Sequence, residues 1–134
     1  MVGGEQPVGL GANEEVLSHL AAIVAGSSDA ILSITLDGIV QTWNAAAEKL
    51  FGYSASEIVG SSIRLLVPPD REAEEDELLA KLSRGESITN FATMRLRKDG
   101  QPVPLVITMS PIRDSALRVV GASKIARDLS ETQR

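Results

Sequence analysis

Residues 30–60 read AILSITLDGIVQTWNAAAEKLFGYSASEIVG, and this stretch carries most of the signals that decide the fold. Two of its segments, Ala30–Thr35 and Ile39–Trp43, are rich in apolar and β-branched residues, a composition typical of strands. Asp37 and Gly38 lie between them, and Asp-Gly is a frequent dipeptide of two-residue hairpin turns. The stretch therefore begins with a predicted antiparallel hairpin.

The second half of the same stretch predicts two short helices. Asn44 is a suitable N-cap for a helix over Ala45–Phe51, and Gly52 is suited to end that helix. Ser54 and Glu57 have the spacing of a capping box, in which each side chain accepts a hydrogen bond from the other residue's backbone N–H. A second short helix is expected to begin there.

One longer helix and three further strands are expected downstream. The helix is predicted over Asp70–Arg84, because this segment follows prolines, is acidic early and is basic near its end. The strands are expected at Ile88–Arg97, Val103–Met109 and Val119–Arg127. In the first of them the apolar residues Ala92, Met94 and Leu96 alternate with Thr93, Arg95 and Arg97, which gives one apolar and one polar face.

The order of these elements predicts an α+β fold, in which helices lie on one face of an antiparallel sheet of five strands. An amphipathic helix is expected before the sheet, over Glu14–Ala25, and residues 1–13 are expected to form a flexible leader. Residues 14–130 would then make up one domain. Residues 131–134 would begin a linker to an output domain that this sequence lacks.

The composition excludes several classes of function. The 134 residues are 43% hydrophobic and 23% charged, with a formal net charge of −5 and no apolar run long enough to span a bilayer. A negative charge without a basic patch argues against nucleic-acid binding. The absence of cysteine excludes thiolate metal sites and cysteine nucleophiles, and the single histidine, His19, cannot provide a three-histidine zinc site. The domain is expected to be cytoplasmic and non-catalytic, without membrane contact.

The acidic residues near the start of the predicted long helix are interpreted as a solvated helix end. They are Asp70, Glu72, Glu74, Glu75, Asp76 and Glu77. Residues three or four apart share a helix face, so these carboxylates surround the helix axis and do not converge on a cation. Negative charge near a helix N-terminus is favourable because of the helix dipole. No metal site and no metal-dependent enzyme are predicted from them.

Four segments together resemble a PAS domain of the bacterial sensory-box type. They are residues 30–44, residues 45–60 (AAAEKLFGYSASEIVG), residues 97–100 (RKDG) and residues 110–128 (SPIRDSALRVVGASKIARD). The resemblance covers about residues 14–130. It implies a five-stranded antiparallel sheet with short helices on one face, which agrees with the fold class predicted from the order of the elements.

The resemblance also implies a sensory and signal-relay function within a larger signalling protein, most often a histidine kinase or a diguanylate cyclase. Asp128-Leu129-Ser130 is a conservative variant, with the hydroxyl kept, of the Asp-x-Thr motif with which the last strand of the family leads into the output region. Asp128 and Ser130 are therefore the expected relay residues. A surface ion pair is expected between Glu57 and Lys98, and such pairs contribute little stability. Related sequences usually have glycine where Leu117 stands, in a turn.

No cofactor is predicted for this domain. Haem-binding relatives take an axial histidine from the long helix, at a position that aligns with about Glu74, and this helix contains no histidine. Covalent flavin and cysteine-linked chromophores need a cysteine, and the corresponding stretch reads SSIRLL at residues 61–66. An unidentified small ligand is left open.

Two modes of action are left open. In the first, the domain is a relay that forms a homodimer through the apolar stripe of residues 14–25 and acts on a downstream output domain, most often that of a histidine kinase. In the second, it is a receptor with an apolar cavity for a small molecule. The candidate lining residues of that cavity are Ile63, Leu66, Leu78, Leu82, Met94 and Val106.

Overall fold

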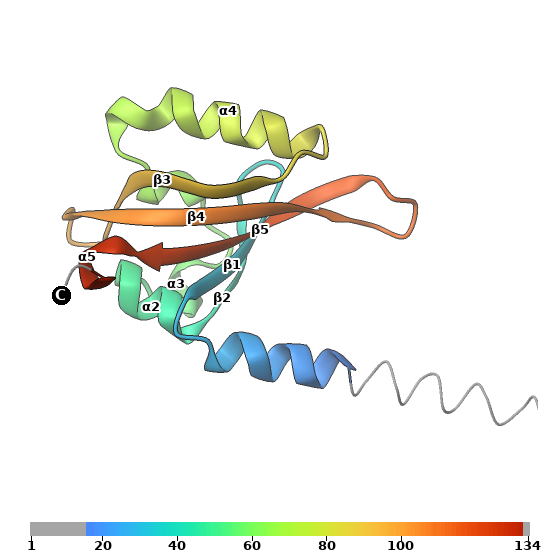
Figure 1. The fold of residues 1–134 in the computed structure, drawn as a ribbon, viewed down its shortest axis with the longest axis horizontal. Helices are drawn as coiled ribbons and strands as arrows, with labels where there is room; N and C mark the ends of the chain where they lie inside the picture. Colours follow the sequence, from blue (N-terminus) through green and yellow to red (C-terminus); the bar gives the residue numbers. More distant parts are fainter. Residues whose placement is uncertain (1–15, 133–134) are drawn as a thin grey trace, which may run out of the picture.

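The computed structural model describes residues 16–132, which contain one sheet with the strand order β2-β1-β5-β4-β3 (Figure 1). Its strands are β1 (Ala30–Thr35), β2 (Val40–Trp43), β3 (Ile88–Leu96), β4 (Pro102–Arg113) and β5 (Val119–Asp128). All neighbouring strands are antiparallel, so the predicted sheet is confirmed. β4 is longer than expected, because its pairing with β5 continues as far as Arg113 and Val119.

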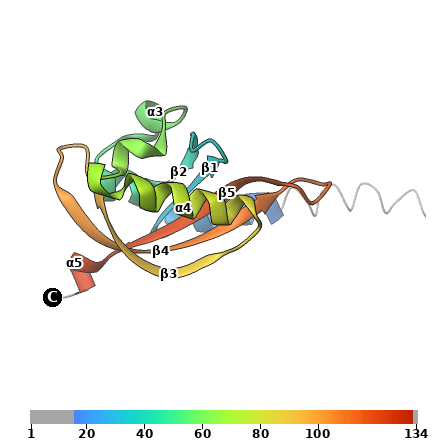
Figure 2. The same ribbon diagram turned by 90° about the horizontal axis from the view of Figure 1, so that it is seen from above.

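Helices cover one face of the curved sheet, which is called the inner face below (Figures 1 and 2). They are α2 (Ala45–Phe51), α3 (Ala55–Ile58), the short 3-10 helices η1 (Ile63–Leu66) and η2 (Pro69–Arg71), and α4 (Glu72–Ser83). A last helix, α5 (Leu129–Thr132), follows β5 directly. The single helix predicted over residues 70–84 is therefore divided into η2 and α4.

The hydrophobic core lies between the inner face and these helices. Ile34 of β1, Leu105 and Met109 of β4, Ile58 of α3 and Leu82 of α4 are all fully buried. The core is mainly aliphatic, as four aromatic residues in the whole chain require. It is one contiguous cluster that contains side chains from both the sheet and the helices.

Asn44 connects three elements near the N-terminal end of the fold. Its Oδ1 atom accepts hydrogen bonds from the backbone N–H of Ala47 and of Ile31, both at 2.9 Å. Its Nδ2 atom donates to the carbonyl oxygens of Val24 at 2.9 Å and of Asp29 at 3.1 Å. The predicted N-cap is confirmed, and the same side chain also holds β1 and the preceding helix in place.

The other predicted helix ends are also confirmed. Gly52 follows α2 with φ of 87°, a left-handed conformation that favours glycine. Ser54 and Glu57 form the capping box of α3, with both side chains accepting from the expected backbone N–H groups. Tyr53 lies between these two helix ends. Its carbonyl oxygen accepts a hydrogen bond from Nε1 of Trp43 at 3.0 Å, which fixes the loop from α2 to α3.

Residues 16–26 form a helix that projects from the sheet (Figure 1). This N-terminal helix confirms the amphipathic helix expected at 14–25, except that residues 14 and 15 and the predicted leader at 1–13 lie outside the described residues. Leu17 is 66% exposed and Ile23 is 64% exposed, so the apolar side chains of the helix have little contact with the domain. Across residues 16–132, no helix has the length and apolar character needed to cross a membrane.

The turn between β4 and β5 is built around Asp114 and Leu117. Leu117 has φ of 67° and is 72% exposed at the tip of the long hairpin. Its backbone N–H donates to the carbonyl oxygen of Asp114 at 2.9 Å, and its own carbonyl oxygen accepts from Arg113 at 2.9 Å. The turn therefore keeps the left-handed conformation that glycine would favour, and hydrogen bonds stabilise it.

Candidate functional site

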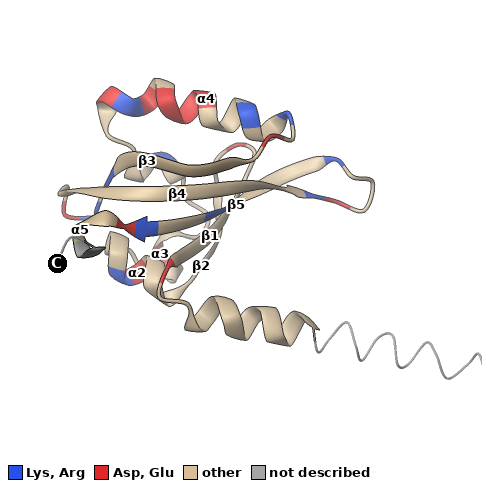
Figure 3. Cartoon of the chain, viewed as in Figure 1, with Lys and Arg blue, Asp and Glu red and all other residues tan. Residues whose placement is uncertain are grey.

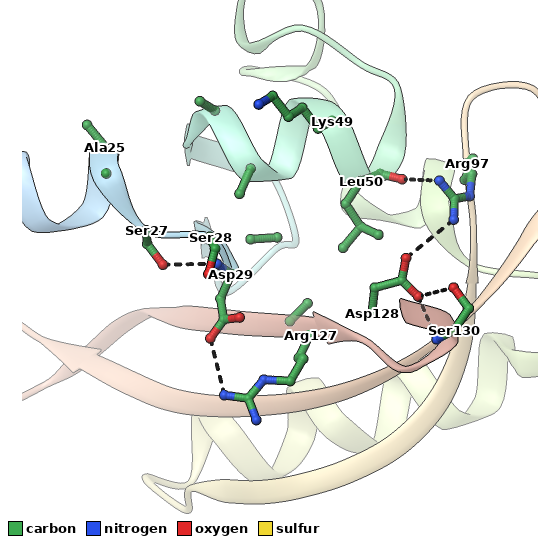
Figure 4. Close-up of a pocket in the computed structure, with 15 residues that line it drawn as sticks. Ala25, Ser27, Ser28, Asp29, Lys49, Leu50, Arg97, Arg127, Asp128 and Ser130 are labelled. Atoms are coloured by element: carbon green, nitrogen blue, oxygen red, sulfur yellow. Dashed lines mark hydrogen bonds and ion pairs between the residues drawn. The ribbon is translucent and has the colours of Figure 1, made fainter. Parts of the chain in front are cut away.

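The end of β5 carries an ionic network that joins three elements (Figure 4). The Asp128 carboxylate accepts hydrogen bonds from the backbone N–H of Ser130 at 2.8 Å and from its hydroxyl at 2.5 Å. Arg97 Nη2 lies 3.5 Å from Asp128 Oδ2, and Arg97 Nη1 donates to the carbonyl oxygen of Leu50 in α2 at 3.1 Å. Asp128 and Ser130, the expected relay residues, are thus coupled to each other, to α2 and to the end of β3.

A pocket lies beside this network, between the end of the N-terminal helix, α2 and the last residues of β5 (Figure 4). Its volume is about 910 Å³, and charged side chains line it together with alanines and serines. One side is closed by Arg127, whose Nη2 lies 3.4 Å from Asp29 Oδ2. Sequence reasoning missed this pocket, because its walls come from four segments that are far apart in the chain.

The six predicted cavity residues do not share one space. Ile63, Leu66, Leu78 and Leu82 are buried in the core under the inner face. Met94 pairs with Pro104, and Val106 pairs with Ala92 of β3 and Arg127 of β5, all on the outer face. An antiparallel pair places its two side chains on the same side of the sheet, so Met94 and Val106 point away from the other four.

The inner face carries a buried ionic cluster where α4 crosses the sheet. Glu75 of α4 is 0% exposed, and Arg95 of β3 and Lys124 of β5 are each 3% exposed. Arg95 Nη2 donates to Glu75 Oε1 at 3.1 Å, and Lys124 Nζ lies 3.5 Å from Glu75 Oε2. Each oxygen of one buried carboxylate therefore faces a cation from a different strand. We call these three residues the buried ionic cluster.

Glu74 extends this arrangement toward solvent. Its carboxylate accepts hydrogen bonds from Thr93 at 2.6 Å, from Arg95 at 2.9 Å and from Arg71 at 2.8 Å. Arg95 also donates to the Thr93 hydroxyl at 2.9 Å, so its guanidinium is held from both sides. The acidic stretch of the long helix was therefore interpreted wrongly in part, because Glu75 is buried and Glu74 is engaged with the sheet.

Burial lowers the pKa of Lys124 below its ordinary value of 10.5, and the charge of Arg95 lowers it further. The carboxylate of Glu75 opposes this change. Burial by itself raises the pKa of Glu74. Hydrogen bonds from Thr93 and Arg95 outweigh this effect, so the pKa of Glu74 lies below its ordinary value of 4.5. The ionised form of Glu74 is therefore favoured, whereas burial disfavours the charged form of Lys124.

A signal for this cluster was present in the sequence. Lys124 shares its strand face with Ala122 and Ala126, which are buried, whereas Ile125 is 41% exposed on the other face. Two small neighbours leave room for a long side chain beneath α4. On β3 too, the face that turns inward is polar, with Thr93 and Arg95.

Glu57 and Lys98 lie on the surface near α3. Lys98 Nζ donates to Glu57 Oε2 at 2.9 Å. This hydrogen bond, together with one from the Ser54 backbone, lowers the pKa of Glu57 below 4.5. Both side chains are exposed, so the pair positions the loop before β4 and contributes little stability.

Because the Glu74 pKa is lowered on folding, the stability that this group contributes is complete above pH 4.5 and is lost as the pH falls through the folded-state pKa. We expect Glu74→Gln to be less stable than the wild type at pH 7, and this difference to shrink steadily below pH 4.5. Urea unfolding from pH 7 to pH 3 measures the effect. Glu77→Gln, exposed on the same helix, is the control. A difference that is independent of pH would show that Glu74 acts without its charge.

The fold and the network around Asp128 define the chain as a small α+β domain whose last strand leads directly into a helix. A family model described as the PAS fold matches residues 18–129. The chain belongs to the PAS family, whose domains are sensory modules.

The relatives come from signalling proteins. The chain is 26% identical over 121 residues to the sensor protein FixL of Bradyrhizobium diazoefficiens, covering 87% of this chain and 24% of FixL. It is 32% identical over 103 residues to two-component system protein A of Emericella nidulans, covering 76% of this chain and 15% of that protein. The chain therefore spans less than a quarter of the length of these curated relatives.

Solved structures agree with the fold. The PAS domain of a protein from Colwellia psychrerythraea is similar with a TM-score of 0.78 and 30% identity, and the match covers 87% of this chain and 98% of that domain. An RNA-binding light-oxygen-voltage receptor has the same TM-score at 24% identity, covering 90% of this chain and 35% of the receptor. The second likeness concerns the fold alone.

Proposed function

We propose that this domain is the dimeric sensory and relay module of a larger cytoplasmic signalling protein, in the first instance a histidine kinase. Its membership of the PAS family and its similarity to FixL and to two-component system protein A support this function. The isolated domain would carry no catalytic step. Its contribution would be to change the state of an output domain that follows α5.

The observation that carries the proposal is the N-terminal helix. Residues 16–26 contain no Asp, Glu, Lys or Arg, and Figure 3 shows this helix free of charge along its length. Val16, Leu17, Leu20 and Ile23 are each more than half exposed. In a monomer these apolar side chains stay exposed to water, which is unfavourable. A second copy of the same helix offers a matching apolar stripe that can cover them.

The network of Asp128 supports the route of transmission. Asp128 ends β5, Ser130 lies in the first turn of α5, and Arg97 connects both to α2. The N-terminal helix is tied to the same region through the hydrogen bond from Asn44 to Val24. A change in the packing of the N-terminal helices would therefore reach the start of α5 over a short distance.

The second mode of action, a receptor with an apolar cavity, is less well supported. Four of its candidate lining residues are packed in the core, and Met94 and Val106 lie on the outer face. The absence of haem and of covalent flavin stays a prediction. It is supported by the engagement of Glu74 with Arg71, Thr93 and Arg95, and by the lack of cysteine.

The dimer is tested with the double variant Leu20→Glu/Ile23→Glu. Because burying each of these side chains contributes about 1.5–3 kcal/mol, we expect the dimer dissociation constant to rise at least about 100-fold. Analytical ultracentrifugation of the 134-residue chain measures it. Leu65→Glu, which changes an exposed leucine of η1 instead, is the matched control and should leave the constant unchanged. A wild type that is monomeric at high concentration, or equal constants for all three proteins, would contradict the proposal.

A further inference from the structure

The relay function leaves the buried ionic cluster without a role. In it, one carboxylate is held by a guanidinium on one side and an ammonium on the other, at 3.1 and 3.5 Å. Arg95 and Lys124 come from β3 and β5, and both are almost completely buried. Two buried cations that converge on the two oxygens of one carboxylate form the donor set with which proteins bind carboxylate ligands.

The fold does not need charge at this position. Replacement of a buried ionic group by apolar side chains of similar volume is often neutral or stabilising, because charges must be removed from water. On the same face, Leu105, Ile107 and Met109 of β4 form an apolar surface, and Leu78 and Leu82 of α4 already pack against it. A cluster that costs desolvation in a domain with an adequate aliphatic core points to a binding role.

The two cations lie on strands in the sheet, whereas the carboxylate lies on a helix that packs on it. Arg95 and Lys124 stand on strands that pair with β4 on both sides. Glu75 stands on α4, whose N-cap position, Arg71, makes no capping hydrogen bond through its side chain. The first turns of α4 carry ion pairs from Arg64 to Glu72 and Asp76, and from Arg95 to Glu74 and Glu75.

We propose that Arg95 and Lys124 form a carboxylate-binding site in the interior of the domain, and that Glu75 occupies it as an internal ligand in the resting state. A small molecule that carries a carboxylate group binds by replacing Glu75. The start of α4 then leaves the sheet together with its side chain. This inference rests on the proposed sensory function, to which it adds the chemical class of the ligand.

The variant Glu75→Ala tests the site directly. The substitution removes a CH₂–COO⁻ group, and acetate has the size and charge of the group removed. We expect acetate to raise the melting temperature of Glu75→Ala by roughly 5 °C at ten times its dissociation constant, with chloride keeping the ionic strength fixed. Glu77→Ala, which removes the same group from the exposed side of α4, should not respond. The variant Glu75→Gln should not respond either, because its amide still fills the site.

Equal responses of all three variants to acetate, or no response of a folded Glu75→Ala, would overturn the proposal. If Glu75→Ala is unfolded without acetate, refolding by acetate and not by chloride supports it. If it stays unfolded at every concentration, ¹⁵N NMR of the wild type with acetate and propionate decides. Shifts confined to residues 72–78, 95 and 123–125 support the site, and their absence refutes it. The dimer measurement uses other variants, so a failure here leaves the relay proposal standing.

Discussion

Replacement of Glu75 by leucine is expected to lower the free energy of unfolding by about 3–5 kcal/mol. The loss arises because Arg95 and Lys124 stay buried at 3% exposure while the carboxylate between them is gone. Arg95 keeps Glu74 as a partner, whereas Lys124 loses the only carboxylate within ion-pair distance among the described residues. Urea unfolding followed by circular dichroism at pH 7 measures the change.

Two further variants separate loss of charge from loss of packing. Glu77→Leu places the same side chain on the exposed side of α4 and should change the stability by no more than about 0.5 kcal/mol. In the triple variant Glu75→Leu/Arg95→Met/Lys124→Met no charge of the cluster is left, and most of the lost stability should return. A triple variant as unstable as Glu75→Leu would show that leucine fits poorly at position 75 for reasons of shape.

The second large effect is expected at Gly121. This residue lies in β5 beside Thr35 of β1, and a Cβ atom there would collide with the carbonyl oxygen of Ile34. The neighbour is backbone in the middle of the sheet, so a rotamer change cannot relieve the collision. We expect Gly121→Ala to lower the free energy of unfolding by about 3 kcal/mol, as severe overpacking does. Thermal and urea unfolding measure it.

Gly26→Ala is the matched control for Gly121→Ala. A Cβ atom at Gly26 meets no heavy atom within 4 Å, and the residue ends the N-terminal helix. The control should change the stability by less than about 1 kcal/mol, in the direction of a gain, because alanine favours helix more than glycine does. If both alanine variants were equally stable, β1 and β5 would have to be able to separate locally without cost.

Local chemistry explains why residues 30–60 were predictable. The turn at Asp37-Gly38, the cap at Asn44 and the capping box of Ser54 and Glu57 each depend on atoms within a few residues of one another. Their geometry is set before distant parts of the chain meet. The pair of Glu57 and Lys98, by contrast, was expected only because of the resemblance, since 41 residues separate its partners.

For strand β3, local chemistry does not determine which face is covered. Alternation of Met94 with Thr93 and Arg95 establishes that the strand has two faces, and it does not say which face is covered. The polar face turns inward because α4 supplies Glu74 and Glu75, whose carboxylates accept hydrogen bonds from Thr93 and Arg95.

By itself, the sequence determined the α+β class, the five antiparallel strands, the caps of α2 and α3 and the family, because each of these follows from local periodicity, turn residues and motif spacing. The tertiary structure alone decided which face of β3 is inner, that Glu75, Arg95 and Lys124 meet, and that Arg97 reaches Asp128. The physical reason is the same in each case. The free energy of a buried charge depends on its partner, and the partners here come from elements that only the packed sheet brings together.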